Sequence, residues 1–437
     1  MVDRIITLLE KGRLLENDNS ISGYKITEID KTSDEFFFIT KNLDMNRAKD
    51  VCLYEVTVYK NFEEGGKKYT GSSTVTIHPT MNDNEIETVL KDASFAAGLV
   101  KNEYYPLAKP DNKGLRSSQE LLPENVAGDV ADAAFKADHY TDGRINSAEL
   151  FVNREDIRII NSNGVDVSYK KSSVDLEFVA EWKKGSSSVE QYRFLTFSRF
   201  NAEKVTEEVD KYLNMSRERA EAQPTPSLKN IPVLLTGAPV KTFFSYYYSQ
   251  TNAEYIYNHF STAKQGESIQ GDLVKGDSIT MSLIPLLEGS TKSSPYDGDG
   301  YSLSEVTVIK DGKVERLWGD VRHSYYLGIE PTGSIGNFKI EPGSKSIEEM
   351  KSQPYLELLS FSDFQMDDTT GDFAGEIRLG RYFDGTKTYP VTGGSISGNI
   401  RQVQENMYFS RETVQENSFL GPKTIQLFNV SLAGAEK

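Results

Sequence analysis

The sequence predicts an α+β protein, with an N-terminal α+β domain built on a mixed or antiparallel sheet and a C-terminal β-rich domain. Helical and strand-like apolar patterns both occur in residues 1–222, whereas strand-like runs between Gly-rich turns dominate after residue 230. The 437 residues are enough for two or three domains. The 23 Tyr and 22 Phe indicate folded cores, because chains that stay unfolded are poor in aromatic residues.

The first predicted unit is a helix, a hairpin and a second helix. Apolar residues at helical spacing predict a helix within residues 1–15. Val51–Tyr59 and Gly71–His78 alternate as strands do, and the polar EEGGKK between them indicates a hairpin. Asn82 or Asp83 can cap the next helix. Its apolar face is Ile86, Val89, Leu90, Ala93 and Ala97.

The second unit is the clearest β region of the chain. Residues 102–122 are predicted to be a loop, and a Pro-Glu pair then opens a helix. Five strand-like runs follow within residues 145–200, and Asn163-Gly164 predicts a type I′ hairpin turn between two of them. A helix over Ala202–Ala222 completes this half.

A linker is predicted at Gln223–Asn230, where two prolines stand among polar residues. It would join an N-terminal domain, 1–222, to a C-terminal domain, 231–437. The C-terminal part opens with a short apolar run, and the aromatic segment Thr242–Phe260 is predicted to be a helix. Most of the remainder is predicted to form strands separated by Gly-rich turns.

Composition and charge exclude several classes of protein. The net charge of −16 disfavours nucleic-acid binding, which needs a basic surface. Cys52 is the single cysteine and cannot form an internal disulfide, which favours a reducing compartment. No apolar stretch has the length of a signal peptide or a membrane span, so we expect a cytoplasmic protein that does not bind membranes.

Metal sites are not predicted from the spacing of the possible ligands. The four histidines are scattered, and no pair has a spacing that puts two imidazoles on one helical face. Asp297-Gly-Asp-Gly300 is similar to the start of a calcium loop, but the twelfth position is Val308 where Glu is needed, so a turn is predicted. Asp367, Asp368 and Asp372 are predicted to form a solvated loop.

Catalytic and phosphate-binding motifs are also missing from the sequence. The string nearest to G-x-S-x-G, Gly394–Gly398, has Ile at the nucleophile position. Neither phosphate-cradling glycine pattern occurs. The run Tyr246-Tyr247-Tyr248 is predicted to be a packed helix face, with the wall of a peptide-binding cleft as the alternative.

Three segments of the C-terminal half resemble the TldD/PmbA family of metallopeptidases, once called modulators of DNA gyrase. They are Asp297–Gly333, Asp368–Asn399 and the ending FNVSLAG, Phe428–Gly434. The first contains a D-x-R, Leu-Gly, Thr-Gly succession at Leu317, Asp320, Arg322, Leu327, Gly328, Thr332 and Gly333. The resemblance implies a C-terminal domain of the TldD/PmbA type.

The catalytic branch of this family carries H-E-x-x-x-H on a helix that follows a strand similar to Pro232–Thr236. Here the three motif positions fall on Ser245, Tyr246 and Gln250, and the family's cysteine position falls near Ile377 or Arg378. Neutral hydroxyls and an amide bind zinc weakly. The resemblance therefore implies the metal-less, TldE/PmbA-like branch, with no cofactor and no catalytic residue in this chain.

As a member of that branch, the chain would form a homodimer or a heterodimer with a zinc-bearing TldD-like subunit and would act on unfolded peptides. Residues that could line a peptide cleft are Tyr247, Tyr248, His259 and His323. Two alternatives remain open at this point. One is a stand-alone hydrolase that uses His259 or His323 with nearby carboxylates, and the other is a non-enzymatic dimeric peptide-binding protein.

Overall fold

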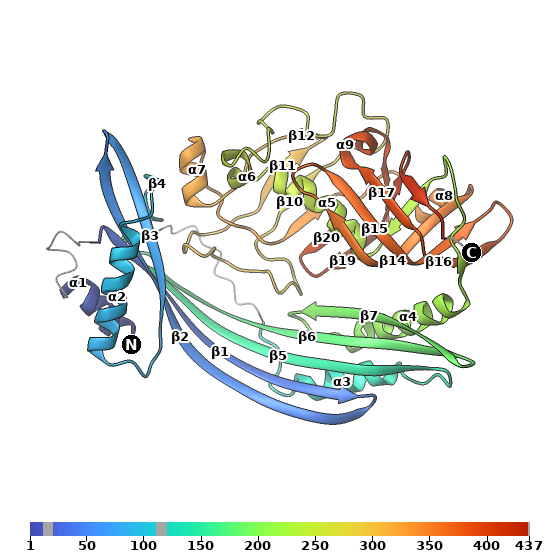
Figure 1. Cartoon of the computed structure of the whole chain (residues 1–437), viewed down its shortest axis with the longest axis horizontal. Coiled ribbons are helices and arrows are strands. Elements are labelled where there is room, and N and C mark those ends of the chain that lie inside the picture. The colour runs from blue at the N-terminus through green and yellow to red at the C-terminus, as the bar shows by residue number, and fades with distance from the viewer. Residues whose placement is uncertain (12–20, 111–119, 436–437) are drawn as a thin grey trace.

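The computed structural model of the chain describes residues 1–11, 21–110 and 120–435, which form three β-sheets (Figure 1). One long, curved sheet belongs to the N-terminal half. Two shorter sheets and a buried helix share one core in the C-terminal half. The mixture of helices and strands confirms the predicted α+β class.

The N-terminal sheet has the strand order β4-β3-β2-β1-β5-β6-β7, and every neighbouring pair is antiparallel. The sequence left a mixed sheet open, and the structure decides for the antiparallel one. Its strands are β1 (Gly23–Ile39), β2 (Asn42–Glu64), β3 (Lys67–Ile77), β4 (Asn102–Glu103), β5 (Gly143–Asn161), β6 (Asp166–Lys184) and β7 (Ser187–Phe197).

The start of this sheet differs from the sequence prediction. Strands are predicted only from Val51 onward, but β1 lies wholly before that residue and β2 begins at Asn42. The reason is that Asn42–Asp50 is exposed on both sides of its strand and is mostly polar, with apolar alternation limited to Leu43 and Met45. Backbone pairing with β1, and not burial of side chains, holds this stretch extended.

Two hairpin turns test the turn chemistry predicted from sequence. Gly65 and Gly66 join β2 to β3, and both have positive φ, 61° and 77°, which confirms the predicted Gly-Gly turn. The type I′ prediction at Asn163-Gly164 is wrong. Only Gly164 has positive φ, and the Asn161 N–H donates to the Val165 carbonyl, which closes a three-residue loop and not a two-residue one.

Four helices cover one face of this sheet and form two separate cores with it. Asn82 caps α2 in a capping box with Glu85, which confirms the first of the two predicted caps. The loop predicted over 102–122 contains β4, and its residues 111–119, like residues 12–15 of the first predicted helix, lie outside the described residues. The helices are α1 (Val2–Lys11) and α2 (Asp83–Ala97) over β1–β3, and α3 (Val126–Lys136) and α4 (Ala202–Glu221) over β5–β7.

The C-terminal sheets surround the helix α5 (Ala238–Gln250). The six-stranded sheet contains β10 (Met281–Leu283), β11 (Val306–Lys310), β12 (Lys313–Val314), β13 (Phe338–Ile340), β19 (Thr413–Glu416) and β20 (Phe419–Pro422). The nine-stranded sheet contains β8 (Gln223–Pro224), β9 (Val233–Thr236), β14 (Tyr355–Met366), β15 (Asp372–Phe383), β16 (Thr388–Thr392), β17 (Ser395–Asn399), β18 (Tyr408–Phe409), β21 (Thr424–Leu427) and β22 (Ser431–Ala433).

Short helices complete this half: α6 (Ala253–Tyr257), α7 (Val321–Leu327), α8 (Ile347–Met350), α9 (Ile400–Val403) and the 3₁₀ turn η1 (Gln404–Asn406). The single helix predicted over Thr242–Phe260 is wrong in extent. Helix α5 ends at Gln250, and Asn252 caps the separate helix α6 by accepting hydrogen bonds from two backbone N–H groups.

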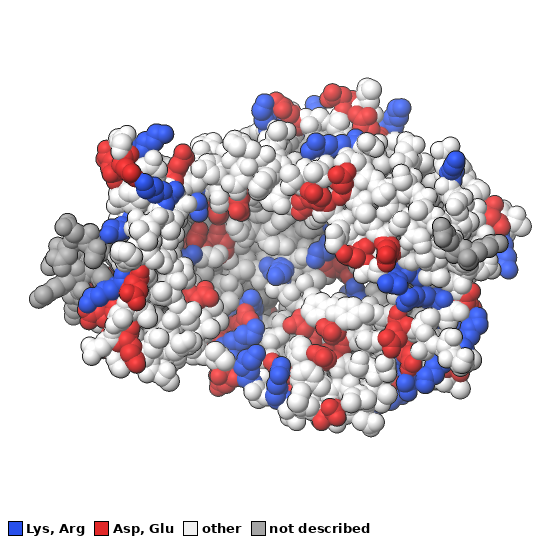
Figure 2. Space-filling view, in the orientation of Figure 1, with Lys and Arg blue, Asp and Glu red and all other residues white. Residues whose placement is uncertain are grey.

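The C-terminal half lies along the β7 side of the curved sheet (Figure 1). Ion pairs join the halves: Arg193–Glu416, Arg381–Glu218 and Lys25–Asp299. Figure 2 shows that the viewed face is hollowed between the two halves. The domain limits stay a prediction, although β8, inside the predicted linker, pairs with β16. No helix in the described part of the chain has the length and apolar character needed to cross a membrane.

Candidate functional site

Helix α5 carries the positions where the family motif would lie, and its surroundings explain why it forms there. Strand β9 lies parallel to β14 and ends at Thr236. Gly237, with a φ of 82°, turns the chain, and a proline occupies the first turn of the helix. Phe244 packs against Phe409 of one sheet and Phe419 of the other, which fixes the helix between them.

The polar side of α5 faces the loop between β14 and β15. Ser245 Oγ donates to Asp368 Oδ1 at 3.1 Å, and Ser249 Oγ donates to Asp368 Oδ2 at 2.6 Å. Gln250 Nε2 donates to the Asp368 backbone carbonyl at 2.7 Å. Residues 245 and 249 lie one helical turn apart, so one carboxylate can accept from both hydroxyls. The prediction that Asp368 belongs to a solvated loop is wrong, because this side chain is bound to the helix.

Two tyrosines of α5 also form hydrogen bonds through their hydroxyl groups. Tyr246 OH accepts a hydrogen bond from Arg401 Nε at 3.1 Å. Tyr247 is fully buried, its OH donates to Gln404 Oε1 at 2.9 Å, and burial raises its pKa. A ring with no exposed surface cannot line an open cleft, so in this conformation Tyr247 is a core residue.

Tyr248 is half-buried beside Trp318, with ring centroids 4.5 Å apart. Its hydroxyl donates to the Ile335 carbonyl at 2.7 Å, and burial raises its pKa. The packed helix face predicted from the sequence therefore describes this segment, since all three tyrosine hydroxyls bond within the C-terminal half.

The two histidines lie in different settings and are not brought to α5. His259 is exposed at the end of α6, with a φ of 63°. His323 on α7 is buried, and its Nδ1 lies 3.0 Å from both carboxylate oxygens of Asp320. Burial would raise the pKa of Asp320, but hydrogen bonds from the His323 ring and backbone hold it below its usual range.

These residues do not fit a zinc ion. The motif positions offer two hydroxyls and an amide, and all three are hydrogen-bonded to Asp368 or Arg401. Zinc in proteins needs three or four nitrogen, sulfur or carboxylate ligands. Within the described ranges, no group of three His, Cys, Asp or Glu side chains could hold a metal ion. Ile377, one of the two residues near which the resemblance would put the family's cysteine, is buried in the C-terminal core.

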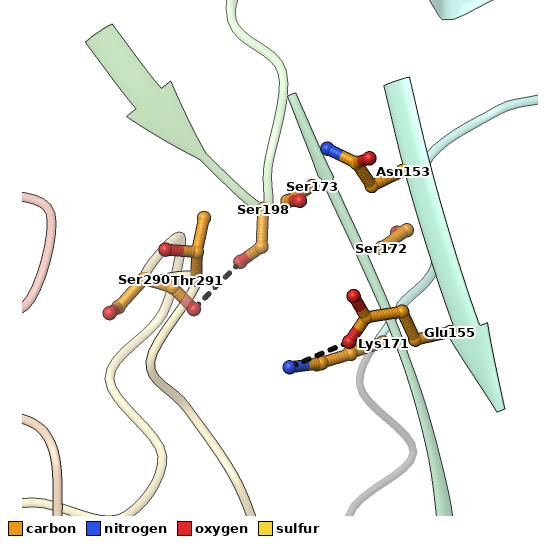
Figure 3. A pocket seen from close by; sticks show the side chains of 8 residues that line it. All are labelled: Asn153, Glu155, Lys171, Ser172, Ser173, Ser198, Ser290 and Thr291. Atoms are coloured by element: carbon orange, nitrogen blue, oxygen red, sulfur yellow. Dashed lines mark hydrogen bonds and ion pairs between the residues drawn. The ribbon is translucent and has the colours of Figure 1, made fainter. Parts of the chain in front are cut away.

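A polar pocket of about 40 Å³ lies between the two halves (Figure 3). Ser198 Oγ donates to the Ser290 carbonyl at 3.1 Å, and Lys171 pairs with Glu155 at 2.9 Å. Burial would raise the pKa of Glu155, but Lys171 and Lys31 hold it below its usual range. No histidine lines the pocket, its one lysine and one carboxylate pair with each other, and its size suits one or two waters. The lining is Asn153, Glu155, Lys171, Ser172, Ser173, Ser198, Ser290 and Thr291.

A larger cavity, of about 480 Å³, adjoins it between the halves. Leu122, Phe200 and Leu287 supply apolar lining, and Arg199 and Glu288 form an ion pair on its wall. It contains no histidine or cysteine. Its remaining polar lining is Glu120, Ser198 and Ser293, and the cavity can enclose an apolar side chain.

The sequence did not predict the hydrogen bond between Ser249 and Asp368, which is the shortest one at the site. Ser249 lies between two motif positions, and Asp368 begins a segment that was singled out for its resemblance to the family. A possible signal was the spacing of Ser245 and Ser249 on one helical face. Nothing in the sequence indicated which of the 65 acidic side chains would meet them.

Comparisons with known proteins agree on one family. A family model described as the PmbA/TldA metallopeptidase C-terminal domain matches residues 228–434, and one described as the central domain matches residues 117–217. An uncharacterised protein of Methanocaldococcus jannaschii is 23% identical over an alignment of 285 residues that covers 61% of this chain. The chain spans 65% of that relative's length.

Two solved structures share the fold over nearly the whole chain. TldE of Thermococcus kodakarensis aligns with a TM-score of 0.79 and 16% identity, covering 99% of this chain and 100% of its own. A Thermotoga maritima protein described as a candidate modulator of DNA gyrase aligns with a TM-score of 0.77 and 16% identity, covering 99% of each chain. At this identity the likeness concerns the fold alone.

Proposed function

This chain belongs to the TldD/PmbA metallopeptidase family, and we propose that it is a TldE/PmbA-like subunit without a metal site of its own in a cytoplasmic peptidase complex. In this proposal a zinc-bearing, TldD-like partner carries out proteolysis of unfolded peptides. This chain would help to form the cavity that encloses the substrate and would bind no cofactor.

The observation that carries this proposal is the hydrogen-bonded state of α5. Asp368 accepts from Ser245 and Ser249, and Arg401 donates to Tyr246, so the side chains at the motif positions already have partners. A helix that held a metal would need free imidazoles or carboxylates at these positions. The segment therefore supports a structural role for α5, with the chemistry supplied by another chain.

Assembly through the C-terminal half is part of the same proposal, either with the TldD-like partner or with a second copy. Extended substrates would be held mainly by backbone hydrogen bonds, which provide affinity with little dependence on sequence. The acidic net charge of −16 supports a peptide substrate over a nucleic acid.

Co-purification from the source cell tests the proposal. The tagged chain should bring down a protein with H-E-x-x-x-H, and the pair should cleave an unfolded protein while the chain alone does not. Metal analysis of the chain alone should give zinc far below one equivalent, and one equivalent held after dialysis would contradict the proposal. The control is the Ser245→Ala variant, which should retain the partner if α5 has no chemical role.

The stand-alone hydrolase is the second candidate, favoured by the Asp320–His323 pair. A carboxylate that holds Nδ1 leaves Nε2 as a possible base. In the described residues, however, no Ser, Thr or Cys side chain is bonded to this imidazole. Peptide cleavage by the isolated chain that His323→Ala abolishes would favour the hydrolase, and His259→Ala serves as the exposed-histidine control. A dimer that binds peptides without any peptidase partner would favour the third, non-enzymatic candidate.

A further inference from the structure

The two faces of the N-terminal sheet have different neighbours. On β6 the even-numbered residues from Val174 to Ala180 are buried beneath α3 and α4. The odd-numbered residues lie on the opposite face, which the C-terminal half covers only at one end. There the centroids of the Tyr169 and Tyr296 rings lie 6.4 Å apart, and the Ser290 carbonyl accepts a hydrogen bond from Ser198, directly after β7.

Beyond this contact the same face carries large apolar side chains in contact with solvent. Tyr192 is 57% exposed, Phe194 45% and Met45 46%. We call this surface the open face. It is defined by one row of paired residues across five strands, together with the Phe151 ring in the next row. The residues of the row are Met45, Phe37, Glu149, Glu177 and Phe194. Each neighbour in the row is a directly paired residue, so all lie on one side of the sheet.

Two carboxylates stand at the centre of the open face without a cation. Glu149 and Glu177 are directly opposite each other on β5 and β6, which places their Cβ atoms about 5 Å apart. In the described part of the chain neither forms an ion pair. The Tyr192 hydroxyl forms a hydrogen bond with Glu177, which supplies no positive charge. Asp175, in the next row, accepts hydrogen bonds from Asn153 and Thr196.

The negative charge of the neighbouring Glu35 is compensated, because this carboxylate forms ion pairs with Arg47 and Lys49. Like charges placed opposite one another destabilise a sheet. The Phe37 and Phe151 rings lie 5.6 Å apart on one side of Glu149 and Glu177, and Phe194 lies on the other side of these carboxylates. The Arg47 guanidinium lies 5.2 Å from the Phe37 ring centroid, but its ion pair is with Glu35. An aromatic surface with an uncompensated negative centre complements a ligand with a cation between apolar groups.

We propose that the open face binds an extended polypeptide segment in which a Lys or Arg lies between two apolar residues that point to the same side. The cation pairs with Glu149 and Glu177, between the rings of Phe37 and Phe194 in the same row. One apolar side chain covers the Phe151 ring in one flanking row, and the other covers Val179 and Tyr192 in the opposite flanking row. This inference rests on the proposed peptide-handling function and adds to it a preference for basic segments.

The spacing of the rows favours a polypeptide over a small cation. Alternate residues of an antiparallel strand lie about 6.8 Å apart, on the strand of the sheet and on the bound segment alike. Moving along β6, Val179, Glu177 and Asp175 occupy successive rows, and Phe151 is paired with Asp175. A Phe-x-Lys-x-Phe segment would therefore place its Lys over the carboxylates and one Phe over each flanking row. A second copy of this chain does not fit the open face, because its own carboxylates would lie against these carboxylates and the like charges would repel.

The test is the binding of labelled peptides to the isolated chain, followed by fluorescence anisotropy. The probe is Ser-Phe-Thr-Lys-Thr-Phe-Ser, compared with the same peptide carrying Glu for Lys and with Ser-Phe-Lys-Phe-Thr-Thr-Ser, which puts Lys and Phe on opposite sides. The first should bind at least about fivefold more tightly than either. The Glu149→Gln/Glu177→Gln variant should weaken it about three- to tenfold.

The matched control is Glu203→Gln/Glu207→Gln on α4, which removes the same charge beside the opposite face and should leave binding unchanged. Equal binding of the three peptides, no binding of any, or no effect of the double variant on the open face would overturn the inference. Dimerisation through this face, abolished by Phe194→Ser in sedimentation experiments, would also overturn it. Because the assay needs no partner and no cleavage, a failed co-purification alongside selective binding would refute only the proposed function.

Discussion

Ser249 on α5 donates a 2.6 Å hydrogen bond to Asp368, 119 residues further along the chain. The same carboxylate accepts from Ser245, so a single side chain holds the loop between β14 and β15 against the helix. The arrangement lies at the positions where the sequence resemblance predicts the metal ligands of the catalytic branch. A contact that holds the fold together therefore stands where the resemblance would put chemistry.

Removing the Asp368 carboxylate should destabilise the protein. Asp368→Ala leaves the Ser249 hydroxyl without its acceptor and the Ser245 hydroxyl with the Thr242 carbonyl alone, and we expect it to lower the free energy of unfolding by about 1–3 kcal/mol. Urea unfolding followed by circular dichroism measures the change. Asp44→Ala, at an exposed position on β2, should change it by less than about 0.5 kcal/mol. Equal effects of the two substitutions would contradict the anchoring role of Asp368.

The buried carboxyl of Asp297 should make stability depend on pH. Burial and the nearby charge of Asp299 raise its pKa to about 6, although it accepts hydrogen bonds from three backbone N–H groups. A folded-state pKa above the unfolded value means that the native state binds the proton more tightly. Its contribution to stability is therefore largest near pH 4 and is lost as the pH rises through 6.

Comparison of the protein with its Asp297→Asn variant isolates this contribution. The stability of the original chain relative to the variant should fall by up to about 3 kcal/mol between pH 4 and pH 7, because a pKa shift of about 2 corresponds to that energy. Urea unfolding at each pH gives the difference. Asp44→Asn should give a difference that does not vary with pH, and a flat difference for Asp297→Asn would refute the prediction.

Arg193 should be important for the contact between the two halves. It bridges Glu208 on α4 and Glu416 on β19, at 2.9 and 2.8 Å, with all three side chains mostly buried. Arg193→Met leaves both carboxylates without this cation, and we expect a loss of about 3 kcal/mol. The exposed Arg378→Met, whose nearest carboxylate is 3.8 Å away, should cost less than about 1 kcal/mol.

A double variant distinguishes the loss of the Arg193–Glu416 ion pair from a general loss of stability. Arg193→Met combined with Glu416→Gln should lose less than the sum of the single losses, since the second change removes the unpaired charge. Thermal unfolding of all four proteins provides the cycle. Additive losses would mean that Arg193 and Glu416 do not stabilise one another.

Glu149→Gln should stabilise the protein, which is unusual for a change in a sheet. It removes the repulsion with Glu177 directly opposite, for a gain of about 0.2–1 kcal/mol. The gain should shrink in high salt, which screens exposed charges. Asp44→Asn, with the same loss of charge, should give no such salt-dependent gain, and a loss of stability in Glu149→Gln would contradict the repulsion between the two carboxylates.

Local signals predicted several elements well. Asn82 caps α2 as expected, and the Gly65-Gly66 turn joins β2 to β3 because glycine adopts positive φ without strain. The type I′ turn at Asn163-Gly164 is wrong, because the bond between the Asn161 N–H and the Val165 carbonyl allows one more loop residue. That hydrogen bond depends on how far two long strands pair, which the dipeptide does not indicate.

The sequence by itself determined the α+β class, the cap of α2, the Gly65-Gly66 turn, and the absence of histidine at the predicted motif positions of α5. These features depend on residues close together in the chain. Only the tertiary structure decided that Asn42–Asp50 is a strand, that Asp368 is the partner of Ser249, and that Glu149 meets Glu177. Strand pairing and helix packing bring these residues together across long separations, and a local pattern contains no information about which distant partner a side chain will meet.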